Sequence, residues 1–253
     1  MRVTTENEVA HAPHPPLPEY YRGEEERRAF VRRIFDATAG DYDRIERLMA
    51  FGSGPWYRRR ALRRAGLAPG MRVLDVAIGT GLVAREALAV LDGRGSVVGL
   101  DPSIGMLRSG ELPREIATVQ GMAEALPFAD GRFDFVSMGF ALRHMSDLEV
   151  VFGELHRVLA PGGRACVLEI TRPKGAVAHA FVKAYMRGVV PLLAKVFARH
   201  AETARLMRWY WDTIEACVPP ERVEATLSAA GFENAARHVE LGIFSEYTGG
   251  KPA

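Results

Sequence analysis

The segment Val73–Gly81, which reads VLDVAIGTG, restricts the fold of this chain more than any other segment. Its apolar start is typical of a buried strand, and a helical pattern follows the glycines. Glycine lets the backbone approach a ligand closely, and the first turn of a helix offers N–H groups that have no partner within the helix. The segment therefore predicts a ligand-binding turn between a strand and a helix.

The alternation of strand and helix patterns continues toward the C-terminus. Its interval is typical of βαβ units, which predicts an α/β fold built on a mostly parallel sheet with helices on both faces. The predicted strands cover residues 73–77, 97–100, 117–119, 133–140 and 165–170 and two segments within 231–247, and the predicted helices between them cover 82–91, 104–112 and 148–159.

Charge balance and cysteine content exclude several classes of protein. The 253 residues include 33 basic and 31 acidic side chains, and a net charge of +2 does not predict nucleic-acid binding. Cys166 and Cys217 lack the spacing of a zinc or redox site, and we expect neither to be catalytic. No apolar run reaches the roughly 18 residues of a membrane span, and the polar N-terminus lacks the apolar centre of a signal peptide. We therefore expect a cytoplasmic protein.

Two acidic residues near the glycine turn help to distinguish its possible ligands. Gly79, Gly81 and Ala84 match the GxGxx[GA] pattern of dinucleotide-binding turns, and Asp101 follows Gly81 by 20 residues, where an acid that binds ribose is expected. A carboxylate at Asp75, just before the turn, is unfavourable beside a pyrophosphate. It suits a ligand that has an ammonium group and no phosphate, such as S-adenosylmethionine. The alternative is that both acids only cap a helix or a turn.

Several short motifs lie on both sides of the glycine turn. They are GMAEALPF (121–128), FD (133–134), FALRH (140–144), RVLAPGGR (157–164), FD (35–36), YD (42–43), LMAFG (48–52), RP (172–173) and Tyr210. Together they resemble the motifs of class I S-adenosylmethionine-dependent methyltransferases, and within that superfamily the UbiE-type C-methyltransferases of ubiquinone and menaquinone biosynthesis. The resemblance covers about residues 35–247.

This resemblance implies a fold, a cofactor and an acceptor. The fold is the Rossmann-like fold of class I methyltransferases, a mostly parallel seven-stranded sheet with helical covers on its N- and C-terminal sides. The cofactor is S-adenosylmethionine, the product is S-adenosylhomocysteine, and no metal is expected. The chain then divides into a flexible arm (1–23) and one methyltransferase domain (24–253), which comprises N-terminal helices (24–70), the cofactor-binding core (71–174), a helical substrate cover (175–218) and a closing helix and strands (219–253).

The resemblance places the cofactor contacts at the carboxyl ends of the strands. The expected contacts are Asp75, Ala77, Gly79, Thr80, Gly81, Asp101, Pro102, Met106, Met122, Ala123 and Gly139. Three positions depart from the family's pattern. Met122 replaces an Asp or Asn that accepts from the adenine amine, Gly139 replaces a frequent Ser, and His144 replaces an Asn. The thioether of Met122 only packs on the adenine ring, so these departures predict an altered pocket.

Arg143 and His144 are the predicted catalytic residues. Both follow the fourth predicted strand, where a doubly wound sheet opens its cleft. Loss of a phenolic proton makes the ortho carbon of the acceptor electron-rich, so a base or a cation near that oxygen promotes carbon methylation. We expect His144 to accept or relay the proton and Arg143 to stabilise the phenolate. The alternatives are that Arg143 pairs with an acid such as Asp147 and that His144 is structural.

Aromatic residues supply most of the predicted substrate contacts. These are Tyr42, Phe51, Phe140, Tyr185 and Tyr210, together with Glu246, which stands where the quinone enzymes more often have His. Ordinary packing is the alternative for each of them. Residues 181–197 are amphipathic, and the sequence leaves three roles open for them: to line a substrate channel, to pack on a second subunit in a homodimer, or to meet a membrane surface.

Carbon methylation of an aromatic or quinol-like molecule is the function that the sequence favours. The departures at Met122, His144 and Glu246 leave open O- or N-methylation of another apolar metabolite, in natural-product synthesis or detoxification. A catalytically weak cofactor-binding subunit of a biosynthetic complex is a further alternative. An oxidoreductase is disfavoured, because that assignment leaves Asp75 and the later motifs unexplained.

Overall fold

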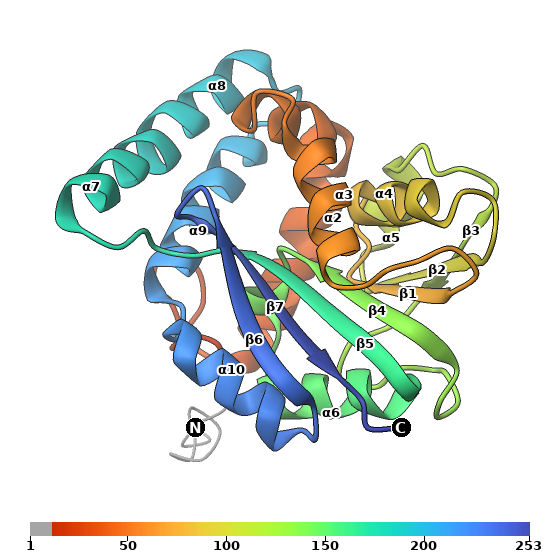
Figure 1. Cartoon of the computed structure of the whole chain (residues 1–253). Coiled ribbons are helices and arrows are strands. Elements are labelled where there is room, and N and C mark those ends of the chain that lie inside the picture. The colour runs from red at the N-terminus through yellow and green to blue at the C-terminus, as the bar shows by residue number, and fades with distance from the viewer. Residues whose placement is uncertain (1–11) are drawn as a thin grey trace.

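The computed structural model describes residues 12–253, and a seven-stranded sheet forms its centre (Figure 1). The strand order is β3 (Ile116–Gln120), β2 (Ser96–Asp101), β1 (Arg72–Val76), β4 (Phe133–Gly139), β5 (Leu159–Ile170), β7 (Phe244–Gly250) and β6 (Glu233–Glu240). Strands β1 to β5 are parallel, whereas β7 is antiparallel to both β5 and β6. The predicted mostly parallel sheet is confirmed.

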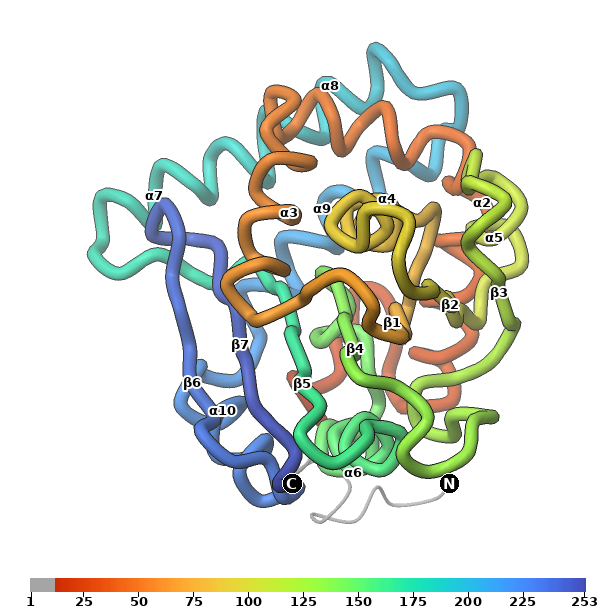
Figure 2. The backbone as a smooth tube through the Cα atoms, turned by 45° about the vertical axis from the view of Figure 1, so that its right-hand side comes forward, coloured from red at the N-terminus to blue at the C-terminus, as the bar shows by residue number. Residues whose placement is uncertain are grey.

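Helices cover both faces of this sheet. In β1, Leu74 and Val76 belong to the core on one face and Val73 to the core on the other, as the two-residue period of a strand requires. In Figure 2, α6 and α10 lie near the C-terminus, away from α3 and α4, which pack on the opposite face. These helices are α3 (Gly54–Arg64), α4 (Leu82–Leu91), α6 (Leu148–Val158) and α10 (Pro220–Ala229), and the short α5 (Ile104–Ser109) follows β2.

A third group of helices lies beyond the carboxyl ends of the parallel strands. Its core contains Phe30 and Ile34 from the N-terminal part of the chain and Trp209 from the C-terminal part. Figure 1 shows β5 leading into this layer. The group comprises α2 (Glu24–Met49), α7 (Ala176–Ala184), the π-helical turn η2 (Tyr185–Val189), α8 (Val190–Phe197) and α9 (Glu202–Ala216). Within residues 12–253, no helix combines the length and the apolar character needed to cross a lipid bilayer.

The segment before α2 differs from the predicted flexible arm. Residues 1–11 lie outside the described part of the chain, but residues 12–23 pack on the helical layer. Tyr21 is 2% exposed, and the Tyr20 hydroxyl donates a hydrogen bond of 2.8 Å to Asp212. The carbonyl of Pro13 accepts from the Val218 N–H at 2.7 Å. The expectation of flexibility was wrong for residues 12–23, because the rings of Tyr20 and Tyr21 pack against Phe30 of α2 and the Tyr21 hydroxyl accepts from the Trp209 indole of α9.

Candidate active site

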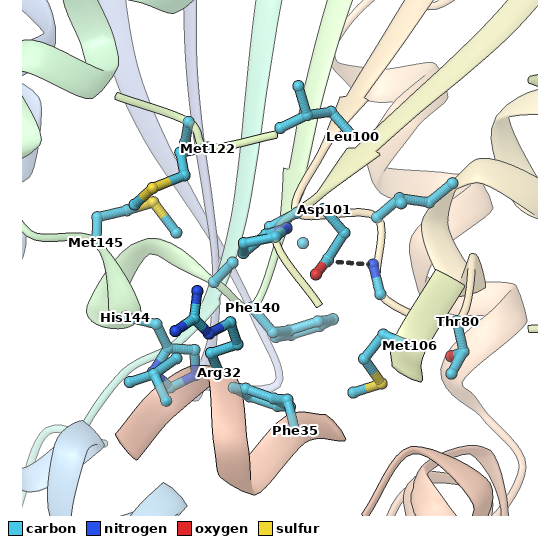
Figure 3. Close-up of a pocket in the computed structure, with 18 of the residues that line it drawn as sticks. Arg32, Phe35, Thr80, Leu100, Asp101, Met106, Met122, Phe140, His144 and Met145 are labelled. Carbon is cyan, nitrogen blue, oxygen red and sulfur yellow. Dashed lines mark hydrogen bonds between the residues drawn. The ribbon is translucent and has the colours of Figure 1, made fainter. Parts of the chain in front are cut away.

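A cavity of about 410 Å³ opens at the carboxyl ends of β1, β2 and β4. Doubly wound sheets bind ligands at this edge, and sites for small molecules usually enclose about 300–1,000 Å³. Figure 3 shows Asp101, Thr80 and Met106 on one side of the cavity and His144 and Met145 on the other. The predicted site residues on its wall are Tyr42, Ala77, Gly79, Thr80, Asp101, Pro102, Met106, Met122, Ala123, Gly139, Phe140 and His144.

The glycine turn forms one wall of the cavity. A Cβ added to Gly79 would meet no atom within 4 Å, so the turn leaves open space on the side where a ligand would lie. Gly81 adopts a φ of 91°, and a Cβ there would lie 2.0 Å from Leu112. Gly81 therefore shapes the turn but is not part of the cavity wall. Ala77 also has a positive φ, of 56°, which places it among the strained residues that gather at functional sites.

Asp101 ends β2 with its carboxylate at the cavity. One oxygen accepts the Gly79 N–H at 2.8 Å and the other accepts the Ser103 N–H at 2.8 Å. Burial raises the pKa of Asp101 to about 6, although these two donors oppose the shift. Each carboxylate oxygen has a second lone pair, so Asp101 retains the capacity to accept from the hydroxyls of a ribose.

Asp75 does not line the cavity. Its position in β1 directs its side chain to the same face as Val73, beneath the start of α4, as the strand period dictates. There one carboxylate oxygen accepts the Ser137 hydroxyl at 2.6 Å, and burial raises the pKa of Asp75 to about 7. The expectation that Asp75 contacts the cofactor was therefore wrong, because its side chain points away from the cavity. Its position indicates that Asp75 supports the glycine turn from below.

Two carboxylates of α2 attach this helix to the turns that form the cofactor side. Asp36 accepts the Ser103 hydroxyl at 2.6 Å and the Gly105 N–H at 2.9 Å. Asp43 accepts the hydroxyl of Thr80 in the glycine turn. These residues were not predicted as site residues, although the motifs that contain them were noticed. The sequence did contain a signal for them: each Asp directly follows an aromatic residue, Phe35 or Tyr42, and both aromatic residues line the cavity.

His144 lies on the opposite side, in the 3-10 turn η1 (Leu142–His144) that follows β4. Its ring stacks on Trp209, with 4.6 Å between ring centroids, and meets the edge of Phe35 at 5.4 Å. Both ring nitrogens are buried, and the described residues supply a hydrogen-bond partner to neither. Burial, reinforced by the charge of Arg143, holds the pKa of His144 well below its usual value. The imidazole is therefore neutral.

Arg143 faces away from the cavity. Its side chain is fully buried, forms an ion pair with Glu169 of β5 and donates from Nε to the Thr213 hydroxyl at 3.1 Å. The guanidinium lies 3.8 Å from the centroid of the Tyr210 ring. The expectation that Arg143 faces the substrate was wrong, because the turn directs consecutive side chains apart. The alternative that Arg143 pairs with an acid is confirmed, but the acid is Glu169. The example Asp147 was wrong, since its carboxylate caps α6 by accepting the N–H of Glu149 and of Val150.

Four of the predicted substrate residues lie away from the cavity wall. Phe51 is 85% exposed and stacks on Tyr185 at 6.2 Å, outside the cavity. Tyr210 lies beneath Arg143, and Glu246 forms a buried ion pair of 2.6 Å with Arg64 of α3. For these four residues, packing or ion pairing replaces the predicted ligand contact. Tyr42 and Phe140 do line the cavity.

Arg64 also forms ion pairs with two members of a group of possible metal ligands. His238, Glu240 and Glu246 bring one ligand atom each within 4.8 Å of one another. Arg64, however, donates to both carboxylates, at 2.9 Å to Glu240 and 2.6 Å to Glu246. A guanidinium already occupies the position that would favour a cation, so this group is an ion-pair network.

Comparison with known proteins assigns the chain to a family. The model of the ubiE/COQ5 methyltransferase family matches residues 22–251. The chain belongs to this family. The demethylmenaquinone methyltransferase of Thermus thermophilus is 35% identical over 87% of this chain and 100% of its own length. The ubiquinone/menaquinone biosynthesis C-methyltransferase UbiE of Geotalea daltonii is 31% identical over 87% of this chain and 96% of its own.

Solved structures share the fold of this ubiE/COQ5 family member. A S-adenosylmethionine-dependent methyltransferase of Thermotoga maritima, described as a possible histamine N-methyltransferase, has a TM-score of 0.61 at 20% identity and covers 87% of this chain and 99% of its own. The [4+2]-cyclase SpnF reaches 0.60 at 18% identity over 88% and 96%. These likenesses confirm the class I fold but not the reaction. Family membership identifies the protein as a S-adenosylmethionine-dependent methyltransferase.

Proposed function

We propose that this protein transfers the methyl group of S-adenosylmethionine to a ring carbon of an aromatic or quinol-like molecule. One observation carries the proposal: a single cavity joins the glycine turn and Asp101 on one side to aromatic residues and the neutral His144 on the other. The named activities of the relatives, demethylmenaquinone methylation and UbiE C-methylation, agree with such an acceptor.

The cofactor side fits an adenosyl group bound along the strand ends. Asp101 would accept from the ribose hydroxyls, and the open space above Gly79 would admit the cofactor against the backbone. Met122 and Ala123 would flank the adenine, where Met122 packs without accepting a hydrogen bond. When bound, the cofactor supplies an activated methyl group for in-line displacement. The protein then contributes by holding the acceptor carbon at attack distance.

The acceptor side fits a ring that carries a hydroxyl group. Phe35 and Phe140 offer apolar faces on the cavity wall, and His144 presents ring nitrogens that have no partner among residues 12–253. Because the pKa of His144 is held far below 6.5, we propose that it acts as a neutral hydrogen-bond partner that orients the hydroxyl and polarises its O–H bond. Tyr42, whose pKa burial raises well above 10, also stays neutral and packs beside the ring.

A labelled-methyl assay tests this proposal. The purified protein is incubated with labelled S-adenosylmethionine and, separately, with a demethylquinol, simple phenols and amines, and the product bond is identified by NMR. A new carbon–methyl bond on the quinol supports the proposal. Methylation of only oxygen or nitrogen would establish the alternative acceptor class. Cofactor binding in calorimetry without transfer to any acceptor would instead favour the cofactor-binding subunit.

We also propose that the outer face of α7 and α8 meets an anionic lipid surface. Its exposed apolar side chains include Phe181 (74% exposed), Leu192 (62%) and Val196 (66%). Lys183 and Lys195 are exposed on the same segment, so apolar and basic groups alternate as they do at membrane interfaces. A homodimer through this face is the alternative occupant. The cytoplasmic location stays a prediction.

Vesicle sedimentation distinguishes these occupants. The wild-type protein is expected to sediment with phosphatidylglycerol vesicles but not with phosphatidylcholine vesicles, and the double variant Phe181→Ser/Leu192→Ser is expected to stay in solution. Val150→Ser, on the exposed side of α6, is the matched control. A wild-type protein that binds neither vesicle, or a dimer in light scattering that the double variant abolishes, would overturn the lipid assignment.

A further inference from the structure

We infer that Arg58 binds an anionic oxygen of a ligand inside the cavity, an inference that rests on the proposed methyl transfer. Arg58 belongs to a run of arginines on α3, but it differs from its neighbours in position. Its residue is 3% exposed and lines the cavity, whereas the side chains of Arg59 and Arg60 are 45% and 55% exposed. Only Arg58 of these three turns inward.

The guanidinium of Arg58 is incompletely paired. Nη2 donates to Glu46 of α2 at 2.6 Å, but Nε and Nη1 are buried and receive no acceptor from residues 12–253. Leaving a buried N–H of a charged group unpaired is unfavourable, so native structures usually satisfy such groups with protein, water or ligand. Here the unsatisfied donors belong to a residue on the wall of a ligand cavity.

The surroundings of Arg58 define the chemistry of this ligand group. The guanidinium carbon lies 5.3 Å from the centroid of Phe140, the residue that follows β4 on the cavity wall. Glu46 accepts a hydrogen bond from Nη2 only, so the other N–H groups of the guanidinium can donate charge-assisted hydrogen bonds to a ligand. An oxygen of the cofactor carboxylate or the ionised hydroxyl of an aromatic acceptor would satisfy them. Both sources present the same chemistry, an anionic oxygen.

Gly54 leaves the space in which Arg58 and Glu46 form their ion pair. A Cβ at this position would lie 2.4 Å from Nη1 of Arg58 and 2.7 Å from Oε1 of Glu46. Glycine at the first position of α3 therefore allows the ion pair to close against the helix backbone. Any side chain there would push the guanidinium from its place.

Titration calorimetry on Arg58→Gln separates the two sources. If Arg58 binds the cofactor, affinity for S-adenosylmethionine falls about 10- to 100-fold, while affinity for decarboxylated S-adenosylmethionine changes little. If it binds the acceptor oxygen, both cofactor affinities stay and kcat/KM for the acceptor falls by a similar factor. Arg58→Lys, which keeps the charge, is expected to recover part of either loss. Arg63→Gln, exposed on the same helix, is the control.

Three results would overturn the inference. They are wild-type affinity and turnover in Arg58→Gln, an equal loss of affinity for both cofactor forms, and no recovery by lysine in a variant that melts like the wild type. Should Arg58→Gln fail to fold, Gly54→Ala replaces it, because this change displaces the guanidinium and leaves its charge. A wild-type protein that does not bind S-adenosylmethionine would refute the proposed function itself.

Discussion

At the scale of single residues, burial sets the chemistry of the acceptor end. His144 lies between Trp209 and Phe35 and within the positive field of Arg143, which together keep its imidazole neutral. A neutral ring has one donor and one acceptor nitrogen. It therefore serves a hydroxyl group better as a hydrogen-bond partner than as a strong base.

Replacement of His144 tests this role. In His144→Ala we expect kcat/KM for the acceptor to fall about 10- to 100-fold, with cofactor affinity unchanged, because a hydrogen bond and a stacked ring are lost. His144→Asn should retain more activity, since an amide also donates and accepts. Because the pKa lies well below 6.5, the wild-type rate should show no titration from this residue between about pH 6 and pH 9. A rate that follows a group near pH 6.5, absent in His144→Ala, would contradict the neutral role.

We expect Asp101, whose carboxylate lies at the cavity, to make cofactor binding depend on pH. Its pKa is raised to about 6, so it contributes stability to the ligand-free protein that is present below the unfolded value near 4 and lost as pH rises through the folded value. A bound cationic ligand stabilises the ionised form of the Asp101 carboxyl group. Binding should therefore release protons between about pH 5 and pH 7, and affinity should rise over this range.

Calorimetry in buffers with different ionisation enthalpies measures the released protons. In Asp101→Asn the release should decrease and cofactor affinity should fall about 10-fold or more, because an NH2 group, which cannot accept, replaces one carboxylate oxygen. Glu115→Gln, exposed between α5 and β3, should bind as the wild type does. Proton uptake on binding would contradict the assignment.

At the scale of elements, α2 closes the cavity because its acidic residues bind the two turns of the cofactor side. The hydrogen bonds of Asp36 lead to Ser103 and Gly105, and a Cβ on Gly105 would lie 2.9 Å from the backbone of Asp36. This close approach leaves little freedom between the helix and the turn after β2.

Asp36→Ala should release this contact. We expect the free energy of unfolding to fall by about 1–3 kcal/mol, amide hydrogen exchange to increase in α2 and α5, and cofactor affinity to fall with them. Asp36→Asn should lie between the wild type and Asp36→Ala, and Glu111→Ala in an exposed loop should change none of the three. Faster exchange spread evenly over the sheet would instead mean a global loss of stability.

The patterns of single strands and helices predicted part of the site. The glycine turn, Asp101 and the mostly parallel sheet follow from local patterns, and the structure places them as expected. The period of a strand could have corrected the role of Asp75, since it puts this residue beneath α4. The period of a helix could have identified Arg58 as a further candidate, since it puts this residue on the buried face with Ala61 and Leu62. The direction of Arg143 was not predictable, because its partner Glu169 lies on another strand.

At the scale of the whole molecule, Asp41 joins α2 to the start of α9. Its fully buried carboxylate accepts the N–H of Arg199 and of His200 and the hydroxyl of Thr203. Burial alone would raise the pKa of Asp41, but these donors outweigh it and lower the pKa to about 2. Residues more than 150 positions apart in sequence are thereby held together.

Acid unfolding reports on this contact. A depressed pKa contributes stability above the unfolded value near 4, and that stability is lost as pH falls toward 2. In Asp41→Asn the free energy of unfolding at pH 7 should fall by about 1–2 kcal/mol, and the difference from the wild type should vanish by about pH 2. Urea unfolding at several pH values measures it, and a difference that persists at pH 2 would assign the loss to packing.

The ordered segment before α2 bears on where this enzyme can be shortened. The Tyr21 hydroxyl lies 3.3 Å from the indole nitrogen of Trp209, and that indole is the surface on which His144 stacks. A truncated version that starts at residue 24 would keep the whole sheet and every residue of the glycine turn. It would nevertheless lose the contact of Tyr21 with Trp209, and with it a support for His144. We therefore expect a version truncated at this point to bind the cofactor but to hold His144 less firmly.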